Sequence, residues 1–347
     1  MKLKAAWCKH TLKFKFTAGT SRGSLKEKTS YYLKLWYNEN PDIFGLGEAG
    51  PLFGLSHEFD TIESEISSFV TIINNGENKP TELSSSLRFA VETAELGLHN
   101  QSFQKLYLNE FESGDSKIPI NGLIWMGDAG FMRKQISEKL DKGFSTIKLK
   151  IGAIDFKTEY EIIKELRSKF SSKDLTIRVD ANGAFSFNKA KEVLKQLGEQ
   201  EVHSIEQPIA ACNWEEMALL CENTPTPIAL DEELIGQNDK VKLLETIKPQ
   251  YIILKPDLHG GLVNSKDWID VAESKGIQWW ITSALESNIG LNAICQFTAQ
   301  YKNLLPQGLG TGQLYHNNIP SPLKIEAGFI SSTGDERWDL SQLNFKS

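Results

Sequence analysis

Residues 146–152 read TIKLKIG, in which apolar side chains alternate with two lysines, Lys148 and Lys150. This alternation predicts a β-strand with both ammonium groups on one face, because successive side chains of a strand point to opposite faces. Such a strand can lie at a sheet edge, where lysines discourage pairing with other chains. It can also direct both lysines into an enclosed site, and the rest of the chain has to decide between the two interpretations.

Short apolar runs recur from residue 117 onward, with helical patterns between them. The runs are KIPINGLIW (117–125), FSTIKLKI (144–151), LTIRVDANG (175–183), VHSIEQP (202–208), TPIALDE (226–232), QYIILKPD (250–257), GIQWWITSA (276–284) and NLLPQGLG (303–310). Strands and helices that alternate with a period of about 25 to 30 residues predict βαβ units and a parallel sheet. Eight strands that each return through a helix fit a closed (β/α)8-type barrel. An open doubly wound sheet is the alternative, but neither G-x-G-x-x-G nor G-x-x-x-x-G-K-[ST] follows the first strand.

The first third of the chain has a different pattern. Residues 10–23 and 27–37 predict two strands joined by a polar loop, and residues 61–75 and 85–101 predict helices. We therefore expect an α+β capping domain at 1–115 and the barrel at 116–320. A C-terminal tail at 321–347 lacks the barrel rhythm, and we expect it to pack on the capping domain.

The composition excludes several classes of function. A net charge of −7 gives no basic footprint for nucleic acid, and no apolar run is long enough to cross a bilayer. The N-terminus lacks the apolar segment of a signal peptide, and the four cysteines are scattered without a C-x-x-C pair. We expect a cytoplasmic protein that acts on a small molecule, without a membrane or nucleic-acid partner. Its oligomeric state cannot be inferred from the sequence.

Acidic residues end three consecutive predicted strands, at the barrel face where enzymes of this architecture keep their chemistry. Asp180, Glu206 and Asp231 end the third, fourth and fifth strands, so they should converge. Carboxylates that lie so close together raise one another's pKa unless a cation holds them. An all-oxygen ligand set suits Mg²⁺, with Mn²⁺ as a substitute. Asp231 is preferred over Glu232 and Glu233 because it directly follows the apolar run.

Lysines end the second and sixth predicted strands, which lie on opposite sides of a ring of eight. Lys148 and Lys150, about 6–7 Å apart at the backbone, should repel each other, which predicts a lowered pKa for one of them. A lysine of this kind can act as a general base near neutral pH, while Lys255 faces it across the pocket. A nearby metal ion would stabilise the oxyanion formed when a proton leaves the carbon next to a carboxylate. The pattern thus predicts a site for α-proton abstraction through an enediolate and disfavours the edge-strand interpretation.

The motifs resemble those of the enolase superfamily, in the muconate lactonizing branch that carries K-x-K on the second barrel strand. KLKIG, RVDANGAFS, IEQP, LDEEL and LKPDLHGG resemble its barrel, and GLGEAGPL (45–52) and SLRFAVETAELGL (86–98) resemble its capping domain. The resemblance covers nearly the whole chain and implies the modified TIM barrel of the superfamily, (β/α)7β. Within the branch, residues 282–293 and 307–323 resemble the o-succinylbenzoate synthases of menaquinone biosynthesis.

The resemblance also implies roles for individual residues. Asp180, Glu206 and Asp231 would bind Mg²⁺, with Asn182 supporting the metal site. Lys150 would take the proton, Lys148 would modulate it, and Lys255 would stay protonated and stabilise the enediolate. The loop at 17–24, which includes Ser21, would close over a succinyl arm. The residues expected to line the carboxylate end of the substrate are Ser283, Gly310, Thr311 and Gly312.

The implied reaction is a dehydration, the conversion of 2-succinyl-6-hydroxy-2,4-cyclohexadiene-1-carboxylate (SHCHC) to o-succinylbenzoate by a carbon–oxygen lyase. The rivals are an N-acylamino acid racemase and a dipeptide epimerase, because lysines on opposite faces also suit these isomerases. Dipeptide epimerases typically carry Asp-x-Asp near the end of the eighth strand, where this chain reads GLGTGQL (308–314) without an acid. A non-catalytic barrel would lack at least one of the three acids or of Lys150 and Lys255, and all are present. His259 could contact substrate, but a hydrogen-bonded loop histidine is the simpler interpretation.

Overall fold

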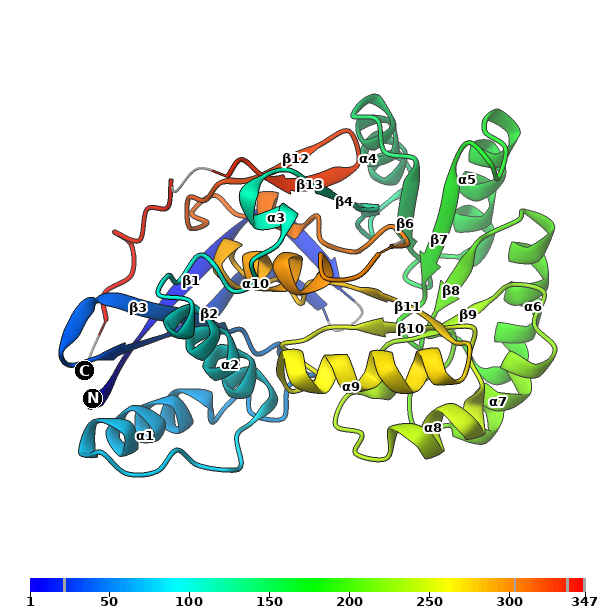
Figure 1. Ribbon diagram of the computed structural model, residues 1–347. Helices are drawn as coiled ribbons and strands as arrows, with labels where there is room; N and C mark the ends of the chain where they lie inside the picture. The colour runs from blue at the N-terminus through cyan, green and yellow to red at the C-terminus, as the bar shows by residue number, and fades with distance from the viewer. Residues whose placement is uncertain (21–22, 303, 335–336, 346–347) are drawn as a thin grey trace.

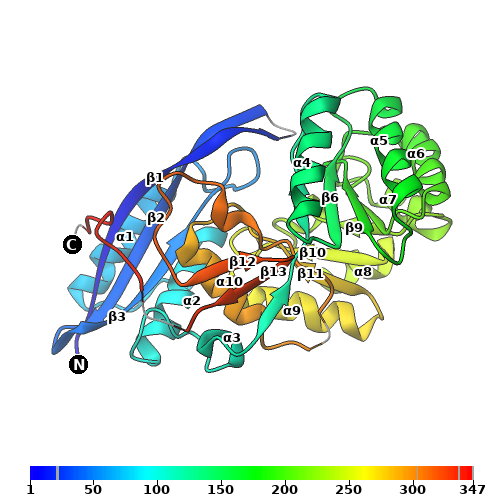
Figure 2. The same ribbon diagram turned by 90° about the horizontal axis from the view of Figure 1, so that it is seen from above.

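The computed structural model describes residues 1–20, 23–302, 304–334 and 337–345, and the chain forms two parts (Figure 1). An antiparallel sheet with two helices lies at one end, and a parallel sheet surrounded by helices lies at the other. Both chain termini lie at the end that carries the antiparallel sheet (Figure 1). Figure 2 shows this sheet on one side of the molecule and most of the barrel helices on the other.

The N-terminal part is an antiparallel sheet covered by two helices. Its strands, in the order β1-β2-β3, are β1 (Leu3–Thr20), β2 (Gly23–Tyr37) and β3 (Asn40–Ala49), and its helices are α1 (Ile62–Asn75) and α2 (Ser85–His99). Two glycines of β3 let α2 approach closely. A Cβ at Gly45 would lie 1.7 Å from the Ala94 carbonyl oxygen, and one at Gly47 would lie 1.9 Å from that of Ala90. The glycines of the GLGEA motif are therefore a packing requirement.

The second part is a parallel sheet of seven strands in the order β5 to β11. The strands are β5 (Gly122–Ile124), β6 (Thr146–Lys150), β7 (Thr176–Asp180), β8 (Ser204–Glu206), β9 (Ile228–Leu230), β10 (Tyr251–Leu254) and β11 (Gln278–Ile281). β6 has a hydrogen-bonded neighbour on each side, so the edge-strand interpretation of its lysines is wrong. On β6, Ile147 and Leu149 pack into the apolar core, while Lys148 and Lys150 line a cavity on the other face.

The eighth strand expected at 303–310 is not a regular strand in the described part of the chain. Two isolated parallel bridges, Ile120 to Gln307 and Thr282 to Gly308, instead connect this segment to both ends of the sheet. Pro306 has no N–H to donate and glycine weakens a strand, which accounts for the short pairing. The bridges close the ring, so an open doubly wound sheet is excluded.

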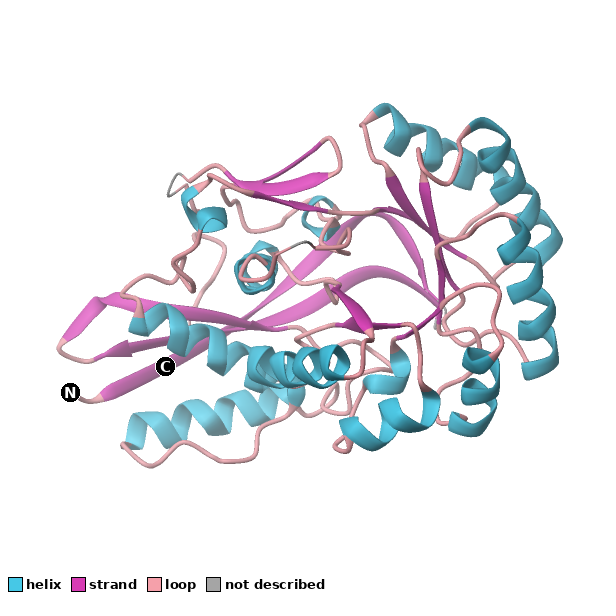
Figure 3. Ribbon diagram, turned by 45° about the vertical axis from the view of Figure 1, so that its right-hand side comes forward, coloured by secondary structure: helices cyan, strands magenta, loops and turns pink. Residues whose placement is uncertain are grey.

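Helices form the outer layer of the barrel (Figure 3). They are α4 (Ala129–Asp141), α5 (Phe156–Lys169), α6 (Phe187–Glu199), α7 (Trp214–Glu222), α8 (Lys240–Ile247), α9 (Gly261–Ser274) and α10 (Asn288–Thr298), and a short α3 (Glu110–Ser113) precedes the barrel. Over the residues that the structure describes, no helix combines the length and apolar character needed to cross a membrane.

The C-terminal segment contacts both parts of the chain. Its hairpin of β12 (Leu323–Glu326) and β13 (Phe329–Ser332) pairs with β4 (Lys117–Pro119), the first half of the run that had predicted a single strand. Farther on, Trp338 and Leu343 pack with apolar residues of the capping sheet, including Tyr32. The domain boundaries expected from the sequence stay predictions.

Candidate active site

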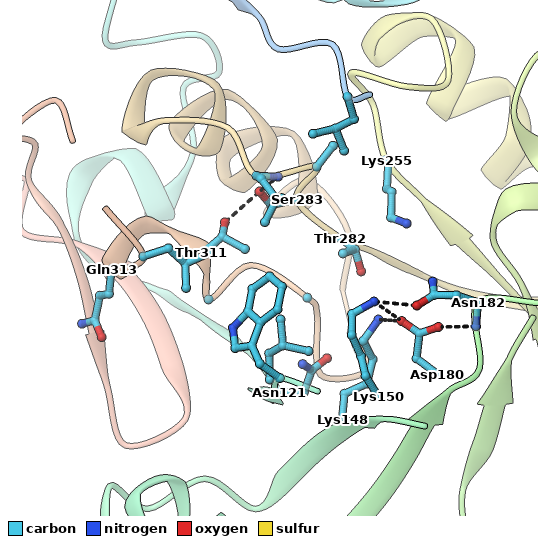
Figure 4. A pocket seen from close by; sticks show the side chains of 18 of the residues that line it. Asn121, Lys148, Lys150, Asp180, Asn182, Lys255, Thr282, Ser283, Thr311 and Gln313 are labelled. Carbon is cyan, nitrogen blue, oxygen red and sulfur yellow. Dashed lines mark hydrogen bonds and ion pairs between the residues drawn. The ribbon is translucent and has the colours of Figure 1, made fainter. Parts of the chain in front are cut away.

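A cavity of about 150 Å³ opens at the carboxyl ends of the barrel strands. Lys150 and Asp180 lie on one side of it, and Lys255 reaches toward them from the other side (Figure 4). Leu52 and Leu55, from the segment that follows β3, close it from the capping domain. The cavity therefore lies between the two parts of the chain.

The register of the parallel strands sets the first wall of the cavity. Lys150 is the direct neighbour of Asp180 on β7, which in turn is the neighbour of Glu206 on β8. Lys148 Nζ donates to Glu206 Oε2 at 2.7 Å and to Asp180 Oδ2 at 3.1 Å. Lys150 Nζ donates to the same Asp180 oxygen at 3.1 Å and to Asn182 Oδ1 at 2.7 Å. Both lysines thus point inward against carboxylates, as the alternation of TIKLKIG requires.

Lys255 and Asp231 form the opposite wall. Asp231 follows β9 and is fully buried, and Lys255 follows β10 and donates from Nζ to Asp231 Oδ2. Glu233, the third acid of LDEEL, instead accepts the Cys212 N–H at 2.8 Å and a hydrogen bond from Gln207. Of Asp231 and Glu233, Asp231 is therefore the acid that contacts a candidate catalytic lysine.

The electrostatics of the site keep its buried lysines charged. Burial alone lowers the pKa of Lys148, but the carboxylates of Asp180 and Glu206 more than offset burial, so its pKa is raised. The pKa of Lys255 is raised in the same way, with Asp231 as the main partner. Lys148 is therefore not the β6 lysine for which a lowered pKa was expected, because the carboxylates outweigh lysine–lysine repulsion. Burial and the neighbouring Asp180 raise the pKa of Glu206 to about 8.

The donor set fits a divalent cation. Asp180, Glu206 and Asp231 are at most 2% exposed, and Glu206 Oε1 and Asp231 Oδ1 have no hydrogen-bond partner among the described residues. Buried carboxylate oxygens without a partner are costly, and hard oxygen ligands are those that Mg²⁺ prefers. As the side chains stand, the described residues contain no group of three or more His, Cys, Asp or Glu placed to hold a metal ion. Lysine ammonium groups lie against these carboxylates instead.

Asn182 and Glu232 extend this network along the rim. Asn182 has a left-handed backbone (φ 44°), which asparagine tolerates better than most residues. Its side chain accepts from Lys150 and donates to Glu232 Oε1 at 3.0 Å. Glu232 lines the cavity, a role that the sequence analysis missed. The sequence signal for this role was that Glu232 directly follows Asp231. The sequence alone does not fix the direction in which the Glu232 side chain points.

Only some of the residues expected at the carboxylate end of the substrate line the cavity. Ser283, Gly310 and Thr311 line the cavity, and the Thr311 hydroxyl donates to Ser283 Oγ at 2.7 Å (Figure 4). Ser283 itself donates to Glu286, so its hydroxyl proton is already committed. Gly312 packs against Asn288 and Leu291 of α10 and does not line the cavity, so its expected role stays a prediction. Ser21 lies outside the described residues.

His259 is a hydrogen-bonded loop histidine, which confirms the simpler interpretation. Its Nδ1 accepts the Lys255 backbone N–H at 3.0 Å, and its ring does not line the catalytic cavity. His259 therefore supports the backbone of Lys255 and does not form part of the cavity wall.

Known proteins share this architecture and sequence. Residues 132–334 match the family described as enolase C-terminal domain-like. The o-succinylbenzoate synthase of Desulfotalea psychrophila is 43% identical over 354 residues, which cover 91% of this chain and 95% of that protein. The N-succinylamino acid racemase of Thermus thermophilus is 35% identical over 155 residues, 45% of this chain and 40% of that protein. The crystal structure of MenC from Desulfotalea psychrophila has a TM-score of 0.84 and 39% identity, covering 95% of this chain and all of that one.

The fold is that of the enolase superfamily. The matched family covers more than half of the chain, and a curated relative aligns with nearly all of it. The chain belongs to the enolase C-terminal domain-like family. The resemblance inferred from the strand-end motifs is thereby confirmed.

Proposed function

We propose that this enzyme dehydrates SHCHC to o-succinylbenzoate in menaquinone biosynthesis. The observation that carries the proposal is the placement of Lys150 and Lys255 on opposite walls of one cavity that also contains Asp180. Similarity to an o-succinylbenzoate synthase over almost the full length supports the choice of substrate. Neither observation alone separates this reaction from an isomerisation.

Asp180, Glu206 and Asp231 would hold Mg²⁺, or Mn²⁺ in its place, near the substrate carboxylate. When bound, the ion supplies positive charge that favours ionisation of the adjacent C–H bond. Neighbouring residues fix the direction of these carboxylates. Asp180, for example, also accepts the Asn182 backbone N–H at 3.0 Å. The buried, unpartnered oxygens of Glu206 and Asp231 support this assignment.

The lysines supply the proton transfers. The Lys150 amine takes the proton from the ring carbon next to the carboxylate, and the electron pair of that C–H bond passes into an enediolate. The positive charge of Lys255 stabilises the enediolate from the opposite wall, which its raised pKa supports. The C–O bond to the ring hydroxyl then breaks, and Lys150 returns its proton to the departing hydroxide, so water leaves. The ring becomes aromatic, which makes the elimination easy.

Racemisation of N-acylamino acids is the second candidate. It is favoured by the same lysine pair, which could remove a proton on one face and return it on the other, and by the similarity to the racemase over 45% of this chain. The two reactions differ in the task of Lys255, which donates a proton only in the racemase. Dehydration by a single base needs Lys150 alone as the proton carrier.

The test is a direct assay of both reactions with one preparation. The purified protein with Mg²⁺ is expected to convert SHCHC to o-succinylbenzoate, and Lys150→Ala is expected to abolish this conversion. Lys164→Ala is a matched control, because Lys164 is an exposed lysine of α5 that pairs with Glu161 at the surface. Racemisation of N-succinyl amino acids without SHCHC turnover would transfer the assignment to the racemase.

A further inference from the structure

The turn after β10 fixes the backbone of Lys255. The Lys255 carbonyl oxygen accepts from the N–H groups of Leu258 and His259, each at 2.9 Å. The Lys255 N–H donates to His259 Nδ1 at 3.0 Å. Both backbone polar groups of the lysine are therefore satisfied within five residues of chain, and one of the partners is a side chain.

This side-chain hydrogen bond replaces a missing sheet partner. β10 ends at Leu254, so the N–H of Lys255 lies beyond the ladder that pairs β10 with β9 and β11. A backbone N–H enclosed by protein needs an acceptor, because a buried donor without one destabilises the folded state. The His259 imidazole meets this need at the residue whose ammonium group faces the substrate.

The imidazole is held neutral and in one tautomer. The ring is 3% exposed, and burial, with smaller contributions from Lys255 and Lys240, lowers the pKa of His259 to about 3. Because Nδ1 accepts a hydrogen bond, the ring proton is on Nε2. Nε2 has no partner among the described residues, and His259 lines a separate polar cleft of about 380 Å³ together with Arg88 and Asn264. His259 therefore contacts Lys255 on one side and faces away from the substrate cavity on the other.

The rest of the turn is anchored independently of His259. Asp257 Oδ1 accepts the Gly50 N–H of the capping domain at 3.2 Å. Glu92 of α2 accepts the N–H groups of Leu262 and Val263, the first turn of α9, at 2.6 Å and 3.1 Å. These contacts should preserve the turn when the histidine is replaced, so that the effect of a substitution is confined to Lys255.

We propose that His259 is a positioning residue for the proposed reaction, which aims the Lys255 ammonium group by fixing the lysine backbone. The inference rests on the role proposed for Lys255. We therefore expect turnover to depend on a hydrogen-bond acceptor at the position of His259 Nδ1. A polar group at the position of His259 Nε2 should not matter for turnover.

Two amide variants separate these positions. In His259→Asn the side-chain oxygen can reach the place of Nδ1, whereas in His259→Gln the amide reaches the place of Nε2 and leaves the Lys255 N–H without an acceptor. His259→Gln is expected to lower kcat for SHCHC by up to about 100-fold, the effect of a displacement near 1 Å, with little change in KM. His259→Asn is expected to restore most of kcat. His203→Gln is the control, since His203 is a half-buried histidine that bonds to Ser204 away from the cavity.

A second measurement needs no substrate. Amide hydrogen exchange of the peptide that contains Lys255 should be slow in the wild type and in His259→Asn, and faster in His259→Gln. Failure of the wild type to turn over SHCHC would reject the proposed function while leaving this exchange pattern intact. Equal kcat in the Asn and Gln variants, a change confined to KM, or equal exchange in all three proteins would overturn the positioning role.

Discussion

Replacement of Lys255 by methionine tests the charge balance of the site. The substitution removes the ammonium group and keeps the length of the side chain. Among the described residues, no other group donates a hydrogen bond to the carboxylate of Asp231, whose Oδ1 already lacks a partner. Asp231 is fully buried, so the variant leaves its carboxylate without the ammonium group that donates to it.

The geometry of the site allows the size of three effects to be estimated. Removal of one partner from a buried ion pair costs about 3–5 kcal/mol of unfolding free energy. Mg²⁺ at a concentration about 100-fold above its dissociation constant should return about 2.7 kcal/mol, since it binds only the folded site. Loss of the positive charge that faces the enediolate should lower kcat about 10²- to 10³-fold.

The assay combines urea unfolding, with EDTA and with Mg²⁺, and SHCHC turnover followed by absorbance. Lys266→Met is the control, because Lys266 forms an exposed pair with Asp270, and solvent screens such pairs so that they contribute little to stability. A Lys255→Met protein with wild-type kcat would refute the assigned role. If Lys255→Met and the wild type had the same urea midpoint in EDTA, Lys255 would not stabilise the buried Asp231 carboxylate.

Three further predictions follow from contacts outside the lysines. Glu92→Gln weakens the cap that α2 places on α9 and should lower the unfolding free energy by about 1–3 kcal/mol. Glu95→Gln is the control, because it breaks an exposed pair and should change the unfolding free energy little. Equal urea midpoints of the two variants would contradict this. Burial lowers the pKa of His203 to about 4 and that of His259 to about 3, so both stay neutral in the folded chain while the unfolded chain takes up protons. Stability should be complete above about pH 6.5 and fall as the pH drops toward 4, by up to about 1.4 kcal/mol per pH unit for each histidine; a midpoint that does not change over this range would be inconsistent with neutral buried rings. EDTA should remove SHCHC turnover, Mg²⁺ or Mn²⁺ should restore it, and turnover that survives chelation would exclude the metal assignment.

The sequence was sufficient to place the centre of the site. Each apolar run from 146 to 254 became a strand, and the charged residues at the strand ends lie along one edge of the sheet, because parallel strands end at a common edge. Lys150, Asp180 and Lys255 line one cavity for this reason. To predict these positions, only the period of the apolar pattern and the order of the strands were needed.

Other features depended on contacts that no local pattern contains. The run at 117–125 divides because β4 pairs with β13, more than 200 residues later in the chain. The expected eighth strand is reduced to two bridges, in which Pro306 and Gly308 limit pairing. The charge of Lys148 depends on distances to carboxylates on two other strands, so the lysines of its own strand could not predict that its pKa is raised.

A crystal structure of the protein grown with Mg²⁺ tests the central claim most directly. The account predicts one ion about 2.0–2.1 Å from oxygens of Asp180, Glu206 and Asp231. It also predicts that Lys150 and Lys255 remain on opposite walls of the cavity beside the ion. An ion bound elsewhere, or these three carboxylates turned away from one another, would contradict the account.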